Sequence, residues 1–238
     1  MIIRRTESLL QLITQPDHAA LAFRIMRQWD AAHFPESPRK RSILNAIEHH
    51  DDGWAGADAQ LVLDGTSGQL LDFVAVCDAI KRETSWLGIE GRESDPYAGA
   101  LMAQHRLHVY RRHVNDPEWR DFFSTVTSAR DRYLRAAGSI TLDQLLDDYR
   151  FVRAGDLASL AFCNNWGSTA DDECGYAMRL EGTSLEVVPD PFGGRAVDIR
   201  IDAREIPNRP YGSLAEAQRT VAAAPLVTLT GVASRAGR

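Results

Sequence analysis

The segment at residues 42–54, SILNAIEHHDDGW, most constrains how this chain can fold. At about 100° per residue it forms a short helix with one apolar face, made by Ile43, Leu44 and Ile47. His50 and Asp51 fall on this same face, whereas His49 points in nearly the opposite direction. Because ionisable groups at the buried end of an apolar face are costly unless they are paired or coordinated, we expect His50 and Asp51 to have a partner inside the fold.

Two interpretations of the His50–Asp51 pair are open at this stage. A neutral imidazole beside a carboxylate suits a divalent metal ion, and Gly53 lets the chain turn out of the helix directly afterwards. A His-Asp pair at a helix end can equally be a solvated cap or a core hydrogen bond. Histidines or carboxylates at inward positions of other helices would favour the metal interpretation.

Three further segments place such residues on an apolar helix face. His18 begins a face with spacing i, i+3, i+4, i+7, i+8 and i+11 through residue 29. A second helix starts at an Asp-Pro pair and presents His105, with His108 one turn later. Asp156 lies mid-helix where an aliphatic residue belongs, which is rare for a structural carboxylate. For each histidine alone, core packing is the alternative; four helices together indicate that their inner faces meet around an ion.

The spacing of apolar residues along the sequence predicts a mainly α fold with a small β-rich C-terminal appendage. We expect a helical metal-binding core at residues 1–165, with short β segments at its start, and a β-rich extension at residues 166–238 packed on that core. The extension is expected to pair with the N-terminal β segments. Residues 55–69 are predicted to form a loop and residues 70–87 a helix.

Composition excludes several classes of partner. The net charge is −6 and the basic residues are scattered, which argues against nucleic acid. The three cysteines, Cys77, Cys163 and Cys174, are too few and too far apart for a zinc ribbon or a disulfide framework, so free thiols are expected. No stretch resembles a signal peptide or a membrane span. We expect a cytoplasmic protein of bacterial type with a small-molecule substrate and no membrane partner, and a homodimer is left open.

The residues carry a resemblance to a known superfamily. The words QPDH at 15–18, HDDGW at 50–54, DPYAGALMAQH at 95–105 and GDLASLAFC at 155–163 resemble an uncharacterised, mostly bacterial family, a domain of unknown function. We associate that family with the HD-domain metal-dependent phosphohydrolases, which share the order His, His-Asp, late Asp. The likeness covers roughly residues 1 to 165.

This resemblance implies an all-α, HD-domain-like core with a defined ligand set, namely His18, His50, Asp51 and Asp156. Two-metal members of the superfamily bind the second ion through extra histidines, which makes His105 the corresponding candidate here. The chain lacks a separate second histidine helix, so one ion and two ions both stay open.

The predicted function is hydrolysis of a nucleotide or small phosphate ester by a metal-activated water. A mixed nitrogen and oxygen ligand set favours a six-coordinate ion such as Mn, Fe, Co, Ni or Mg, with Zn retained as a candidate. The candidate catalytic residues are His105, Asp52 and His108. The alternatives are an HD-fold diiron oxygenase and a catalytically silent sensor that binds a metal or ligand. Arg106, Arg111 and Arg112 could hold a phosphate if they turn inward, but a solvated helix face is the expected position of each.

Overall fold

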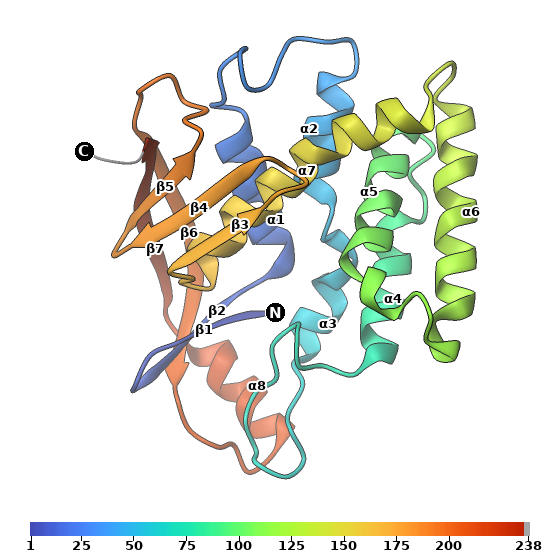
Figure 1. Ribbon diagram of the computed structural model, residues 1–238. Helices are drawn as coiled ribbons and strands as arrows, with labels where there is room; N and C mark the ends of the chain where they lie inside the picture. Colours follow the sequence, from blue (N-terminus) through green and yellow to red (C-terminus); the bar gives the residue numbers. More distant parts are fainter. Residues whose placement is uncertain (236–238) are drawn as a thin grey trace.

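The computed structural model describes residues 1–235 and places a curved seven-stranded sheet beside a layer of helices (Figure 1). The strands are β1 (Ile2–Arg5), β2 (Leu9–Ile13), β3 (Ser168–Asp171), β4 (Tyr176–Glu181), β5 (Ser184–Val188), β6 (Val197–Pro207) and β7 (Leu226–Arg235). The α-helices are α1 (Gln15–Met26), α2 (Lys40–His49), α3 (Ala55–Gln60), α4 (Asp78–Ile89), α5 (Pro96–Val109), α6 (Arg120–Ala136), α7 (Leu142–Cys163) and α8 (Leu214–Ala223).

The prediction of a mainly α fold, and with it the all-α, HD-domain-like architecture, is wrong. About 48% of the chain is helical and 20% is strand, and the fold is mixed α/β with one large sheet. The strand order is β1-β2-β6-β7-β5-β4-β3, and only β5 and β7 run parallel. The sequence predicts β segments at its start and in the C-terminal extension, but their union into one sheet depends on hydrogen bonds between distant segments, which local patterns do not carry.

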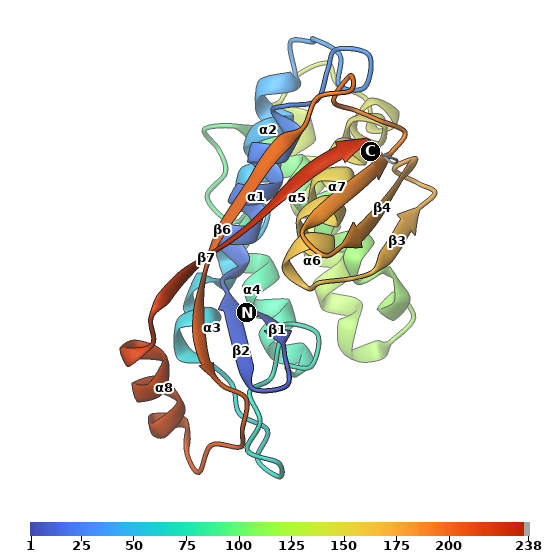
Figure 2. The ribbon, with the colours of Figure 1, turned by 90° about the vertical axis from the view of Figure 1, so that its left-hand side faces the viewer.

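The N-terminal strands belong to the same sheet as the C-terminal ones, as the sequence predicted. Residues 9–12 of β2 pair antiparallel with residues 204–207 of β6. Along β6 the side chains of Ile199, Ile201 and Ala203 alternate inward while charged neighbours face out, which fixes the register because a one-residue slip would expose the apolar set. Figure 2 shows β6 and β7 as two long strands of the sheet, and the two pair with each other.

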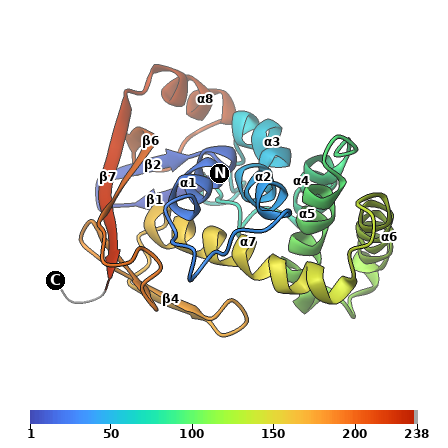
Figure 3. The same cartoon turned by 90° about the horizontal axis from the view of Figure 1, so that it is seen from above.

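Three of the four helices that supply the site begin at a side-chain cap, whereas α2, with Arg39 at its N-cap, does not. Thr14 accepts a hydrogen bond from the Asp17 amide at the start of α1, and Asp95 does the same for the Ala98 amide at the start of α5. Thr141 forms a capping box at the start of α7. α1 and α7 pack between the sheet and the remaining helices, with α6 on the far side (Figure 3). The inner ends of α1, α2, α5 and α7 therefore meet in the interior.

Two local predictions are wrong. Residues 55–60 form α3 where a loop was expected, and the helix expected from residue 70 begins only at Asp78. The Asp72 carboxylate accepts hydrogen bonds from the amides of Val74 and Ala75, and an aspartate that caps a turn in this way competes with helix formation.

Two other expectations can be compared directly with the structure. Cys77, Cys163 and Cys174 are free thiols, as expected. Within the described part of the chain, no helix combines the length and apolar character needed to cross a membrane.

Candidate metal centre

Five predicted side chains from four helical segments meet in the interior. The structure brings together His18 in the first turn of α1, His50 and Asp51 at the end of α2, His105 on α5 and Asp156 on α7. We call these five residues the His-Asp cage. Both His18 and His50 are fully buried, and Asp156 reaches closest to solvent, with 17% of its side chain exposed.

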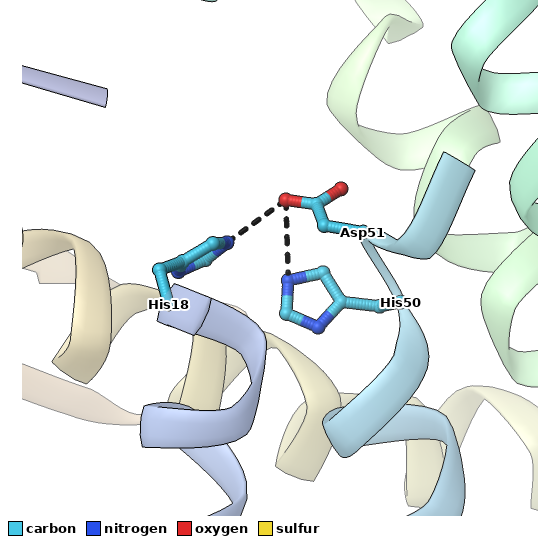
Figure 4. Close-up of side chains that lie close together, drawn as sticks. All are labelled: His18, His50 and Asp51. Carbon is cyan, nitrogen blue, oxygen red and sulfur yellow. Dashed lines mark hydrogen bonds and ion pairs between the residues drawn. The ribbon is translucent and has the colours of Figure 1, made fainter. Parts of the chain in front are cut away.

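The cage atoms have the separations expected of ligands to one ion. His18 Nε2 lies 2.8 Å from Asp51 Oδ2, and His50 Nε2 lies 3.6 Å from the same oxygen (Figure 4). Asp156 Oδ1 is 3.4 Å from His50 Nε2 and 3.8 Å from His18 Nε2. Ligands at about 2.0–2.2 Å from a six-coordinate ion are about 2.8–4.4 Å from one another. These four separations fall in that range, and two groups of three, His18-His50-Asp51 and His50-His105-Asp156, each lie close enough together to hold an ion.

The outer nitrogens of His18 and His50 are held by partners that set the tautomer. Ser159 donates its hydroxyl proton to the Asp156 carbonyl at 3.0 Å, so it accepts a hydrogen bond from His18 Nδ1 at 2.8 Å. His50 Nδ1 donates to the Ile47 carbonyl, also at 2.8 Å. With Nδ1 of both rings engaged by these partners, each Nε2 faces the cage, which is the arrangement of metal-ligating histidines.

His105 approaches the cage from the other side of Asp156. Its Nε2 lies 3.9 Å from Asp156 Oδ2, whereas His18 and His50 face Oδ1. Its Nδ1 is 3.1 Å from the Tyr149 hydroxyl, which holds the ring in place. Burial, outweighing the nearby Asp156 carboxylate, lowers the pKa of His105 to about 3. The ring is thus neutral at neutral pH.

One ring nitrogen supports a cation in the cage directly. His50 Nε2 is buried and has no hydrogen-bond partner among residues 1–235. An unsatisfied buried polar atom costs free energy, and a metal ion bound there would satisfy it. Two carboxylates, Asp51 and Asp156, face one guanidinium, Arg106, which leaves one negative charge for a cation to balance.

Arg106 is a site residue that helical periodicity placed wrongly, and Ser159 and Tyr149 are two more that the sequence did not single out. Arg106 was expected in solvent, but it is buried, and its Nη2 donates to Asp51 Oδ1 at 2.6 Å and to the His50 carbonyl. The error came from the helix face: α5 is enclosed on nearly all sides, with nine buried residues. The apolar residues all around its sequence were the available signal.

The same ion pair controls the charge state of the cage. Burial opposes ionisation of Asp51, but the Arg106 guanidinium and His50 outweigh it and hold the pKa of Asp51 well below its usual range. Burial also opposes the charged form of His50, yet the carboxylates of Asp51 and Asp156 raise its pKa above the ordinary value. A proton on His50 is therefore the substitute for a metal cation, and metal and proton compete for one nitrogen.

The other two catalytic candidates lie outside the cage. Asp52 is turned to the surface, where its Oδ2 accepts from Arg92 at 3.0 Å and lies 3.0 Å from His49 Nδ1. His108 lies one turn beyond His105, with its Nδ1 3.5 Å from Glu173 Oε2. Burial, and after it Arg153 and Arg111, lower the pKa of His108 to about 4. Of the two, His108 contacts the ring of Tyr149, whose hydroxyl also holds His105.

A separate cavity of about 490 Å³ lies between β2, β6, α3 and α8. Leu12, Leu61 and Val221 are among its lining residues, and none of the five cage residues lines it. Pro16 and Asp17, which directly precede His18 in the first turn of α1, also line it.

Comparison with known proteins identifies a family without a described activity. The family model described as "Protein of unknown function (DUF3891)" matches residues 1–208, which include the whole cage and β1 to β6. No curated protein and no solved structure matches the chain. The expected resemblance to a domain of unknown function is confirmed by this match, whereas the link to the HD-domain superfamily stays a prediction.

Proposed function

The chain belongs to the DUF3891 family of proteins of unknown function, and we propose that it is a metal-dependent hydrolase of phosphate esters. The observation that carries this proposal is the convergence of three Nε2 atoms, from His18, His50 and His105, on two carboxylates, with each Nδ1 held by another group. Fixed histidines and open carboxylate oxygens form a first shell for a divalent ion. A small phosphate ester, including a nucleotide, is the proposed substrate.

The nitrogen and oxygen donors suit Mn, Fe, Co, Ni, Mg or Zn. A divalent ion bound there would supply a nucleophilic water at neutral pH, because it lowers the pKa of coordinated water to about 7. Around it, Ser159 fixes the His18 tautomer and Arg106 holds the Asp51 carboxylate. His105 is neutral and can bind the ion or accept a proton from the attacking water.

The structure favours one ion over two. The two candidate ligand groups, His18-His50-Asp51 and His50-His105-Asp156, share His50, and one imidazole nitrogen binds one ion. The second oxygen of Asp51 already accepts from Arg106, so the guanidinium occupies the place that a bridged second cation would take. This is evidence against the diiron oxygenase alternative, which needs two ions.

The order of ligands along the chain supports phosphate as the substrate class. His18, His50-Asp51 and Asp156 follow the order that the resemblance to the HD-domain phosphohydrolases implied. That likeness concerns the ligand set alone, since the overall fold differs.

Metal analysis of protein purified without chelators tests the proposal. We expect about one divalent ion per chain, and release of phosphate from p-nitrophenyl phosphate or from members of a nucleotide panel. Two irons per chain together with oxygen consumption would replace the proposal with the oxygenase. One ion without turnover on the whole panel would replace it with the sensor, and protein without metal would remove the cage as a metal site.

A further inference from the structure

Three basic side chains next to the cage converge on one carboxylate. Arg153 Nη1 donates to Glu173 Oε2 at 2.5 Å, His108 Nδ1 lies 3.5 Å from the same oxygen, and Arg111 Nη2 lies 3.9 Å from Oε1. We call His108, Arg111 and Arg153 the basic cluster. It joins α5 and the turn after it to α7, and the carboxylate comes from the turn between β3 and β4.

The two sides of this contact differ in burial. Arg153 is 6% exposed, and its other terminal nitrogen bonds to Asp171. The Glu173 side chain is 61% exposed. A buried guanidinium needs an anion, whereas an exposed glutamate in a turn is well hydrated without a partner. The cation is therefore fixed in the fold, and Glu173 is the member of the pair that can leave.

The basic cluster lies one helical turn from the cage on two helices at once. His108 follows His105 by three residues on α5, and Arg153 precedes Asp156 by three residues on α7. Tyr149 links the two places, because its hydroxyl is 3.1 Å from His105 Nδ1 and its ring is 5.6 Å from the His108 ring. One helical turn is about 5.4 Å, a distance that a phosphate ester spans.

We propose that the basic cluster is the phosphate-binding subsite of this hydrolase and that the Glu173 carboxylate occupies it when no substrate is bound. The proposal rests on the proposed function and adds the substrate group, a phosphate dianion, and the residues that hold it. Guanidinium groups recognise phosphate and carboxylate oxygens with the same planar donors, so Glu173 is a stand-in for the ligand. Figure 1 shows the β3–β4 hairpin, which carries this turn, lying alongside α7.

Calorimetric titration with inorganic phosphate tests this assignment, on the full chain with and without metal. Glu173→Gln removes the competing carboxylate and should tighten phosphate binding about tenfold, the equivalent of one charge-assisted hydrogen bond. Asp172→Asn is the matched control, because it removes the same charge from the exposed neighbouring position of the turn. It should change the affinity less than about twofold.

Replacing a side chain of the basic cluster should weaken phosphate binding. Arg111→Gln, at a 60% exposed position, should weaken phosphate binding about three- to tenfold. Arg112→Gln, whose exposed guanidinium contacts His113 instead, should leave it unchanged. Arg153→Lys should also weaken binding, and Arg111→Gln keeps the test decisive if that buried variant fails to fold.

The outcomes separate this inference from the proposed function. Equal tightening in Glu173→Gln and Asp172→Asn, or no change in Glu173→Gln and Arg111→Gln, would overturn the subsite even in protein that holds one metal ion and turns over substrate. Absence of metal would overturn the proposed function, while the titration of the metal-free protein would still decide whether the basic cluster binds phosphate.

Discussion

Residues 49–52, His-His-Asp-Asp, form two histidine–aspartate pairs that the fold treats in opposite ways. The inner pair, His50 and Asp51, is buried and meets residues from three other helices. The outer pair, His49 and Asp52, is also in contact, with Nδ1 and Oδ2 3.0 Å apart, but its side chains are 40% and 36% exposed. The residue types are the same, and only the surroundings differ.

This difference shows what turns a common residue pair into a candidate metal site. Around the outer pair, water competes for every donor and acceptor, and such an exposed ion pair contributes about 0–1 kcal/mol to the free energy of unfolding. Inside, each polar atom needs a partner from the protein or a bound ion. His50 Nε2 lacks a hydrogen-bond partner within residues 1–235, whereas the outer pair also binds Arg92. Variants of the two pairs test this comparison.

The largest expected effect is on stability. Asp51→Asn leaves the buried Arg106 guanidinium without its carboxylate, which should lower the free energy of unfolding by about 3–5 kcal/mol. Asp52→Asn should lower it by about 1 kcal/mol or less. Urea denaturation of both variants in chelator measures the difference, and similar losses in the two would show that burial does not separate the pairs.

The next effect is on metal affinity. His50→Ala removes a proposed ligand and should weaken metal binding by more than the roughly 10–100-fold typical of losing an outer-shell partner. His49→Ala should bind metal like the wild type, because its ring lies outside the cage. Competition with a fluorescent chelator gives both constants, and equal metal loss in the His49 variant would refute the assignment of the inner face.

A smaller change tests the hydroxyl that orients His18. Ser159→Ala removes the acceptor for His18 Nδ1 and should weaken metal binding about 10–100-fold with the ligands intact. Ser128→Ala is the control, since the Ser128 hydroxyl is exposed and donates to the Ser124 carbonyl within α6. Unchanged affinity in Ser159→Ala would mean that the tautomer is fixed by some other contact.

The smallest effect concerns pH. In the unfolded chain a histidine takes up a proton below about pH 6.5, whereas buried His105 stays neutral down to a pKa of about 3. Protons therefore favour the unfolded state in this range, and stability should fall as the pH drops from 6 to 5. His105 should account for about 1 kcal/mol of that fall.

Urea denaturation in chelator at pH 6 and pH 5 measures this contribution. His105→Gln should flatten the dependence relative to the wild type, because it removes the histidine whose pKa falls on folding. A His105→Gln slope equal to that of the wild type would contradict the assigned protonation state.

The sequence by itself determined that the five cage residues face inward. Helical period alone placed His18, His50, Asp51, His105 and Asp156 inward and His49 outward, and the Asp-Pro pair located the start of α5. These properties are local, because they depend on neighbours three or four residues away. Whether the cage binds a metal stays a prediction.

Only the tertiary structure decided what lies beside those faces. The sheet joins residues 9–12 to residues 204–207, and the cage pairs Asp51 with Arg106, which the helical pattern had assigned to solvent. Glu173, far along the chain, meets His108 and Arg153 in the same way. A side chain's partner and its exposure depend on which elements become neighbours in space, and the distance along the chain between them leaves no periodic trace in the sequence.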